Sequence, residues 1–426
     1  MLLTTLVSLL SLSSLVVASP VAPAAAPEKR GFPFSAPHYS LYINDIIPYD
    51  SWPLADKIKP YNRVLLAFWE SKGAQAAPVS WEGFTDAQRQ AILTNYHDNG
   101  IALMVSAFSD DDHIVSNKAD PVATAQSIGA WVKKYNVDGV DIDYEDFKPL
   151  QEDPAGSLAW LTAFHNELAT QLPLSDYAIS STPSAWMYGS AFGGIDSVYC
   201  KLHAAVGSKI SWYALQLYNG QPGAWNTCEN TYWNSAKPDF LSVNQISQNC
   251  GIPLSQITIG KLWSQADSAT AGSADELPTP VEFATCLNQF KANNNYPLTG
   301  IMVWAAHLDN WVSAAPLDKA HTQGGAINFL SDTLSALSSA PVANSSTSAS
   351  GSASASGASA SGGASGAAGA ASGAAGSASG TKAAGASGSN ASAAAASGKP
   401  TSGASPVTAA GGLTLVLATV ACILLF

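Results

Sequence analysis

The chain is short of basic residues. Among its 426 residues are 19 Lys and Arg against 31 Asp and Glu, which gives a formal net charge of −12. All the acidic residues except Glu28 lie in residues 31–342, with only 15 of the basic ones. Because a domain that acidic repels polyanions, we expect neither nucleic acid nor an anionic membrane surface as a partner.

Both ends of the chain lack the composition of a folded domain. Residues 1–18 are apolar and end in Val-Val-Ala, as a secretory signal peptide does, and residues 19–30 end in a Lys-Arg pair typical of propeptide processing. Residues 343–406 are almost entirely Ser, Ala and Gly without an aromatic residue, which predicts a disordered stalk. Asn344 and Asn390 begin N-glycosylation sequons, so we expect a glycoprotein.

The last apolar run, Leu413–Phe426, is too short for the roughly 20 residues of a membrane-spanning helix. Small residues at 402–404, a polar spacer and this tail instead resemble a GPI-anchor signal, with the spacer and tail at 407–426. We therefore expect a secreted protein at the plasma membrane or cell wall that meets the membrane only through a lipid anchor. The attachment residue stays open.

Cysteine is scarce, and no Cys-x-x-Cys pair occurs, which argues against a zinc site. We expect no metal and no cofactor. In an oxidising compartment, the four cysteines outside the tail predict two disulfides. Three pairings are possible among Cys200, Cys228, Cys250 and Cys286.

Between the ends, residues 31–342 alternate β-rich runs with helical patterns. The runs lie at 38–44, 63–69, 101–107, 139–145, 177–182, 211–218, 256–262 and 300–305. Helix starts are signalled by Thr85-Asp86-Ala87-Gln88 and by Asp120-Pro121. Eight such units predict an α/β fold, a single (β/α)8 TIM barrel. A doubly wound open sheet is the alternative, but no Gly-rich phosphate loop follows any strand.

The most informative segment is Asp138-Gly-Val-Asp-Ile-Asp-Tyr-Glu145, called here the acidic strand. Its alternation places Asp141, Asp143 and Glu145 on one face of a strand, with about 6 to 7 Å between neighbours. Like charges that close oppose one another's ionisation, so we expect at least one proton to be retained near neutral pH. A general acid requires such a proton.

Glu145 is the last residue of the fourth predicted strand, and barrel active sites lie at the C-terminal ends of the strands. Asp138 breaks the alternation, so we expect it to bond backbone at the start of the strand. The alternative for the whole segment is a buried structural ion cluster. Few cations lie nearby in sequence to pair with it, which disfavours that alternative.

At these residues the sequence resembles glycoside hydrolase family 18, whose signature Asp-x-x-Asp-x-Asp-x-Glu lies on the fourth strand of a (β/α)8 barrel. Gln216-Leu217-Tyr218-Asn219 is similar to the Gln-x-Tyr-Asn of its plant-type branch, and Trp304 stands where the family has the floor of the cleavage subsite. On the third strand, Ser106-Ala107-Phe108-Ser109 replaces the usual Ser-x-Gly-Gly. We expect Phe108 to change the cleft wall and leave the substrate less certain than the reaction.

The resemblance implies substrate-assisted catalysis with retained configuration, unlike the two-carboxylate scheme of most glycosidases. Glu145 would protonate the glycosidic oxygen, while the sugar's own acetamide attacks the anomeric carbon. Asp143 and Tyr218 would hold the acetamide, and Asp141 would keep a proton behind Asp143. For substrate binding we expect Gln216, Asn219, Trp304 and Trp186.

Three further signals are weaker. Asp110–Asp112 with His113 predicts a solvated loop rather than a calcium site. Glu70 and Tyr188 follow strands, and either substrate binding or a plain surface role would suit them.

The leading hypothesis is a chitinase-like hydrolase of β-1,4-linked N-acetylglucosamine. An endo-β-N-acetylglucosaminidase of the N-glycan core is the alternative with the same chemistry. A carbohydrate-binding lectin on an inactive barrel is opposed by the presence of Glu145, and a structural wall protein is supported only by the stalk. We expect a monomer, but the sequence leaves open the oligomeric state, the choice of glycan, and endo or exo action.

Overall fold

The computed structural model describes residues 34–264, 277–294, 296–306 and 325–339. Within them, eight parallel strands pair in the order β1-β9-β8-β7-β6-β5-β4-β2, and β2 pairs with β1 to close a barrel. The strands are β1 His38–Ile43, β2 Arg63–Glu70, β4 Ala102–Ser109, β5 Gly139–Tyr144, β6 Ala178–Ser181, β7 Trp212–Gln216, β8 Ile257–Leu262 and β9 Gly300–Ala306. The predicted (β/α)8 barrel is confirmed, and its fourth strand is β5.

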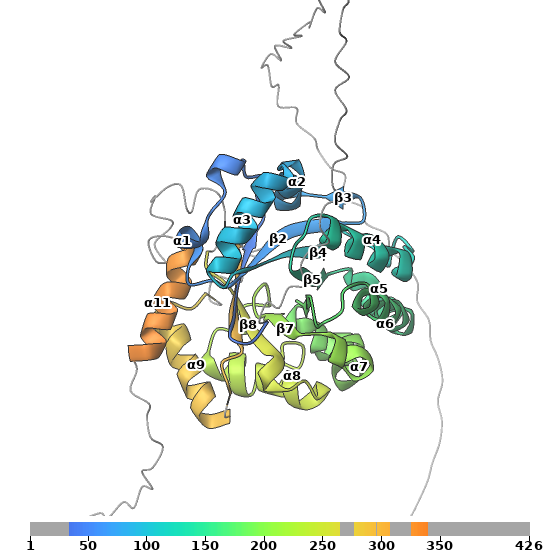
Figure 1. Ribbon diagram of the computed structural model, residues 1–426. Coiled ribbons are helices and arrows are strands. Elements are labelled where there is room, and N and C mark those ends of the chain that lie inside the picture. Colours follow the sequence, from blue (N-terminus) through green and yellow to red (C-terminus); the bar gives the residue numbers. More distant parts are fainter. Residues whose placement is uncertain (1–33, 265–276, 295, 307–324, 340–426) are drawn as a thin grey trace, which may run out of the picture. The chain divides into compact units, whose positions relative to one another are not determined.

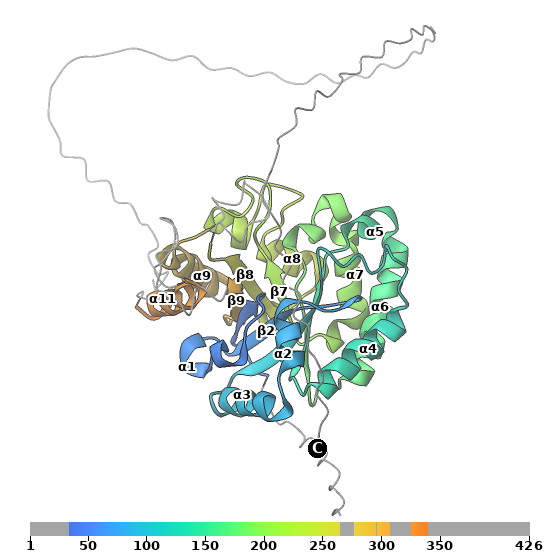
Figure 2. The same cartoon turned by 90° about the horizontal axis from the view of Figure 1, so that it is seen from above.

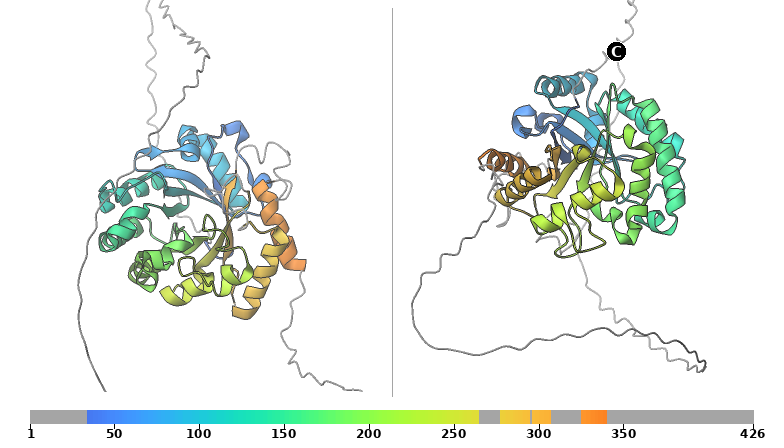
Figure 3. Two further views of the ribbon diagram at one scale, coloured as in Figure 1. Left: turned by 180° about the vertical axis from the view of Figure 1, so that it is seen from behind. Right: turned by 90° about the horizontal axis from the view of Figure 1, so that it is seen from below.

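Helices surround the barrel in chain order (Figures 1 and 2). They are α1 Ala55–Ile58, α2 Ala76–Gly83, α3 Asp86–Asp98, α4 Pro121–Lys134, α5 Phe147–Glu152, α6 Pro154–Gln171, α7 Val198–Val206, α8 Val243–Cys250, α9 Pro280–Asn294 and α11 Gly325–Ser339. The last of them lies beside the first, as Figure 3 shows from behind, and the Tyr61 hydroxyl after α1 donates to the Ala326 carbonyl at 2.6 Å. β3, Gly73–Ala74, is an antiparallel partner of β2 outside the closed ring.

Both predicted helix starts are confirmed. Thr85 caps α3 in a capping box, in which its side chain accepts from the Gln88 amide and the Gln88 side chain accepts from the Thr85 amide. Asp120 caps α4 by accepting from the Ala123 amide, and Pro121 occupies the first turn. These caps satisfy amide groups that have no partner inside the helix.

The core has two parts, because successive residues of a strand face opposite sides of the sheet. The larger part packs the outer faces of the strands against the helices. The smaller part fills the barrel and includes Tyr42, Phe68 and Tyr218 near the C-terminal ends of their strands, with Trp304 packed against them. The interior therefore ends in an aromatic layer at the end of the barrel where active sites lie.

Asp138 begins the acidic strand at the opposite end and is fully buried. Its carboxylate accepts the backbone amide of Leu103 at 2.8 Å and contacts His97 Nε2 at 3.0 Å. The predicted backbone-bonding role is confirmed. Asp138 ties β5 to β4 and to α3, and so sets the register of the strand that carries the other acids.

Two disulfides form, as predicted, and the structure selects one of the three pairings. Cys200 of α7 joins Cys250 of α8, and Cys228 joins Cys286 of α9. The paired residues are 50 and 58 positions apart, so each bond removes unfolded-state entropy worth about 4 kcal/mol in the chain-entropy relation. Both stabilise the side of the barrel that follows β6.

The predicted signal peptide and propeptide (1–30), stalk (343–406) and spacer and tail (407–426) lie outside the described residues. Within the described part, no helix is both long and apolar enough to cross a membrane.

Candidate active site

The acidic strand has the alternation that the sequence predicts. Val140, Ile142 and Tyr144 belong to the outer core. Asp141 and Asp143 are 1% and 5% exposed, on the opposite, inner face of β5. The strand ends at Tyr144, one residue earlier than predicted, so Glu145 is the first residue beyond it. The three acids therefore run up the barrel interior to its C-terminal end.

Asp141, the deepest of them, accepts hydrogen bonds from four hydroxyl groups. The donors are Tyr42 at 2.7 Å, Ser106 at 2.9 Å, Ser180 at 2.5 Å and Thr182 at 2.7 Å. They come from β1, β4, β6 and the residue after β6. Four donors use the full acceptor capacity of a carboxylate, so the Asp141 side chain is held in place from three strands and the turn after β6. The role of Asp141 as holder of a proton stays a prediction.

Asp143 and Glu145 share a hydrogen bond between their carboxyl groups. Burial raises the pKa of Asp143 well above its usual value, and the charges of Glu145 and Asp141 raise it further. Burial also raises the pKa of Glu145, while the hydrogen bond from Gln216 opposes that rise. Both pKa values are therefore raised, the direction in which the pair holds a proton to higher pH than a free carboxyl would; retention of that proton near neutral pH stays a prediction.

Gln216, at the end of β7, holds the pair together. Its Nε2 donates to Asp143 Oδ1 at 2.8 Å and to Glu145 Oε1 at 2.7 Å. Its Oε1 accepts from the Ser184 hydroxyl at 3.2 Å, which fixes the orientation of the amide. Gln216, predicted to bind substrate, thus contacts the two acids that would act on it.

An aromatic floor lies beside the acids. Trp304 is partly exposed and packs on Phe68, with ring centroids 5.5 Å apart at 21°, and on Tyr42 at 5.4 Å. Tyr218, 4% exposed, belongs to the same interior cluster. Asn219 follows it with a φ of 58°, a left-handed conformation that Asn tolerates. An indole that stacks on Phe68 and remains partly exposed suits stacking on the apolar face of a pyranose.

Trp186 lies apart from this floor. It is in the 3₁₀ turn Ala185–Tyr188 after β6 and packs between Phe147 at 4.5 Å and Phe192 at 5.0 Å, against the outer core. It remains partly exposed, so its predicted contact with sugar stays a prediction. Tyr188, in the same turn, is fully buried and is excluded as a substrate contact.

The expectation that Phe108 changes the cleft wall is wrong. Its ring is fully buried in the outer core, against Tyr144, Trp160 and Phe164, at centroid distances of 6.4, 6.2 and 5.4 Å. The backbone explains why the Phe108 ring points into the outer core, because Phe108 and Ser109 have φ values of 78° and 154°. Both stand where the resembled family has Gly, and both keep a glycine-like backbone that turns the ring away from the cleft.

The acidic run after β4 is tied to its neighbours. Asp112 accepts from the Ser71 amide at 2.7 Å and the Ser71 hydroxyl at 2.5 Å. Glu70 accepts from the Ser109 hydroxyl at 3.0 Å and pairs with Lys72 at 2.8 Å. In the described ranges, no group of three His, Cys, Asp or Glu residues is arranged to hold a metal ion.

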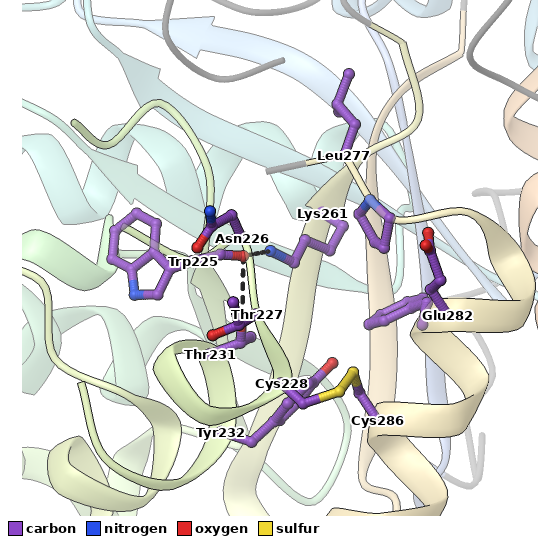
Figure 4. A pocket seen from close by; sticks show the side chains of 12 residues that line it. Trp225, Asn226, Thr227, Cys228, Thr231, Tyr232, Lys261, Leu277, Glu282 and Cys286 are labelled. Atoms are coloured by element: carbon purple, nitrogen blue, oxygen red, sulfur yellow. Dashed lines mark hydrogen bonds between the residues drawn. A yellow bond between two sulfur atoms is a disulfide. The ribbon is translucent and has the colours of Figure 1, made fainter. Parts of the chain in front are cut away.

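A cavity of about 390 Å³ lies outside the barrel, between β8, the loop after β7 and α9 (Figure 4). Lys261 lines this cavity, and its Nζ donates hydrogen bonds to the carbonyls of Leu217 at 2.9 Å and Trp225 at 3.3 Å. The Cys228–Cys286 disulfide lines another side. None of the three acids lines it. The acids and this cavity are separate features of the fold.

A hydrogen-bonded carboxyl pair and a partly exposed indole lie at the C-terminal end of the (β/α)8 barrel, where the active sites of such barrels are found. No protein-family model matches the chain. A chitinase of Enterococcus faecalis is 26% identical over 270 residues, which is 60% of this chain and 74% of that protein.

The solved structures that match the chain do so at low identity. A family 18 chitinase from Pseudoalteromonas aurantia is 22% identical with a TM-score of 0.48, over 65% of this chain and 98% of that one. An endo-β-N-acetylglucosaminidase from Cordyceps militaris is 15% identical with a TM-score of 0.43, over 71% and 92%. The chain carries the complete four-acid signature on its fourth barrel strand, β5, and it is similar to the E. faecalis chitinase over 60% of its length.

The raised pKa of Asp143 predicts a pH-dependent cost to stability. Between the unfolded-state pKa and the higher folded-state pKa, the folded protein binds more protons, so the free energy of unfolding falls as pH rises. Asn at 143 can still accept from Gln216 and donate to Glu145 without titrating. We expect Asp143→Asn to be more stable than the wild type by a margin that grows from about pH 4 upward. Urea unfolding at several pH values measures this stability difference. Parallel curves of unfolding free energy against pH for the two proteins would contradict the prediction.

Proposed function

We propose that the protein hydrolyses β-1,4 linkages that follow an N-acetylglucosamine, with retention of configuration and with chitin-type chains as substrate. The observation that carries the proposal is the hydrogen-bonded pair of Asp143 and Glu145, both bound by Gln216, at the end of the barrel that also holds the partly exposed Trp304. Glu145 is the outermost of the acids, where a glycosidic oxygen can reach it.

In the first step, Glu145 gives its proton to the glycosidic oxygen as the bond to the anomeric carbon breaks. The carbonyl oxygen of the substrate's acetamide forms the new bond to that carbon, and an oxazolinium results. Water then attacks the same carbon from the side that the leaving group left, and its proton passes to Glu145. Two displacements at one carbon retain the configuration.

The other acids suit this scheme because neither is free to act as nucleophile. Asp141 lies deep in the barrel under four hydroxyl donors. Asp143 is bonded to Gln216 and Glu145, and its negative charge would stabilise the positive acetamide of the intermediate. Tyr218, in the interior layer below, is the proposed second partner of the acetamide.

The choice of chitin rests on the relative described as a chitinase. An endo-β-N-acetylglucosaminidase of the N-glycan core remains the rival, because the resemblance of the motifs fits both activities. A lectin would not need a proton on Glu145, whereas burial raises the pKa of Glu145, as a general acid requires.

We further propose that the protein is secreted and carried at the cell surface by a GPI anchor, as a glycosylated monomer. The apolar first 18 residues, the Ser/Ala/Gly stalk at 343–406 and the apolar tail support this. A stalk of that length would carry the barrel away from the membrane toward a wall polymer.

Replacing Glu145 by Gln removes the proton donor and keeps the shape of the side chain. We expect kcat on N-acetylglucosamine oligomers to fall by about 100-fold or more, the usual contribution of a general acid, while oligomer binding persists. Oligosaccharide release and isothermal titration measure the two effects. Glu152→Gln, at an exposed residue of α5, is the matched control. Unchanged turnover in the Glu145 variant would exclude it as the acid.

A direct comparison of substrates separates chitin from N-glycan. We expect release of short oligomers from N-acetylglucosamine hexamer and no cleavage of a high-mannose glycopeptide, with product size measured by mass spectrometry. Cleavage of the glycopeptide alone would replace the chitinase proposal by its rival.

Surface anchoring can be tested with the full chain in a fungal host. We expect a phosphatidylinositol-specific phospholipase to release it from membranes, and deletion of residues 407–426 to send it to the medium. Retention at the membrane after that deletion would contradict the anchor.

A further inference from the structure

The three consecutive acids after β4 do not have the same surroundings. Asp112 is buried and bonded to Ser71. Asp111 is exposed, and its charge acts on Lys72. Asp110 is also exposed, but its charge acts on Asp143 and Glu145. Of the three acids, Asp110 is therefore the one whose charge acts on the carboxyl pair.

Strand register puts Asp110 there. β4 and β5 run parallel, with Phe108 beside Asp143 and Ser109 beside Tyr144. The residues that follow these last pairs are Asp110 after β4 and Glu145 after β5. Neighbouring parallel strands are about 4.8 Å apart, so the two backbones are still close where these residues leave the sheet.

The loop that carries Asp110 is held on both sides. Before it, the Phe108 ring is buried in the outer core, and the Ser109 hydroxyl donates to Glu70. After it, the Asp111 amide donates to the Ser109 hydroxyl at 3.2 Å, and Asp112 is fixed on Ser71. Asp110 is therefore placed by its neighbours and needs no partner of its own to stay near Glu145.

The charged and titratable groups around Glu145 are mostly acidic. Asp143 of β5 and Tyr199 of α7 interact with Glu145, Asp141 and Tyr42 of β1 interact with its partner Asp143, and Gln216 of β7 is neutral. Lys72, the nearby cation, pairs with Glu70 and interacts with Asp111 and Asp112. Over the described ranges, no ion pair involves Asp110. Its charge therefore acts on the carboxyl pair without a counter-charge of its own.

We propose that Asp110 is a positioning residue that keeps the catalytic proton on the Asp143–Glu145 pair and so sets the upper pH limit of the site. An anion at this place opposes the loss of a proton from either carboxyl. Its effect on turnover rests on the proposed function, since only an enzyme that uses Glu145 as an acid depends on that proton. Its effect on the titration of the pair does not.

The kinetic test is the pH profile of kcat/KM on N-acetylglucosamine oligomers. With Asp110→Asn, we expect the alkaline limb to move down by about half a pH unit or more, with activity near that of the wild type on the acid side. Asp111→Asn removes an equal charge one residue further along and should leave the limb in place. Asp110→Glu should restore the wild-type profile, and the shift should shrink at high salt. The proposal would be overturned if the alkaline limb of the kcat/KM profile lay at the same pH in the wild type and in Asp110→Asn.

A second measurement needs no turnover. The carboxyl groups of the free protein can be titrated by ¹³C NMR, with the Glu145 signal assigned from Glu145→Gln. We expect the pH midpoint of the Glu145 titration to be lower in Asp110→Asn than in the wild type and to be unchanged in Asp111→Asn. Coincident titrations would overturn the role of Asp110 whether or not the protein cleaves a glycan. A shifted titration in a protein that cleaves nothing would instead overturn the proposed function.

Discussion

The site depends on two carboxyl groups that are too close to ionise together. Asp143 and Glu145 share a hydrogen bond inside the barrel, where burial raises the pKa of both carboxyls and the charge of Glu145 raises that of Asp143 further. Such a pair needs donors that fix its geometry without neutralising it. Gln216 provides them as a neutral amide, whereas a Lys or Arg at that place would lower both pKa values and release the proton.

Only a closed barrel can assemble these groups. The donors to Asp141 come from β1, β4 and the end of β6, and Gln216 comes from β7. In an open sheet, residues of β1 and β5 would be several strands apart. Closure brings their inner faces together across the interior, so the four hydroxyls can surround one carboxylate and leave the next acid up the strand to hold the proton.

Much of this could be predicted from one segment. The alternation in residues 138–145 predicts the strand and its inner face, since a period of two needs no tertiary information, and the closeness of like charges predicts the direction in which the pKa values shift. The hydroxyl donors Tyr42, Ser106, Ser180 and Thr182 could not be found that way. Each is an ordinary strand residue, and no sequence spacing connects residues that meet only after closure. The disulfide pairing was beyond prediction for the same reason.

Phe108 and Asp110 show how the backbone decides what residue type alone cannot. An aromatic residue at a glycine position indicated an altered cleft, but a left-handed φ turned its ring into the outer core. Three consecutive aspartates indicated one solvated loop, but the register of β4 and β5 gives the three side chains different surroundings. Because Ser109 pairs with Tyr144, the next residue must leave the sheet beside Glu145. The buried ring of Phe108 thus anchors the start of the loop that places Asp110 near Glu145.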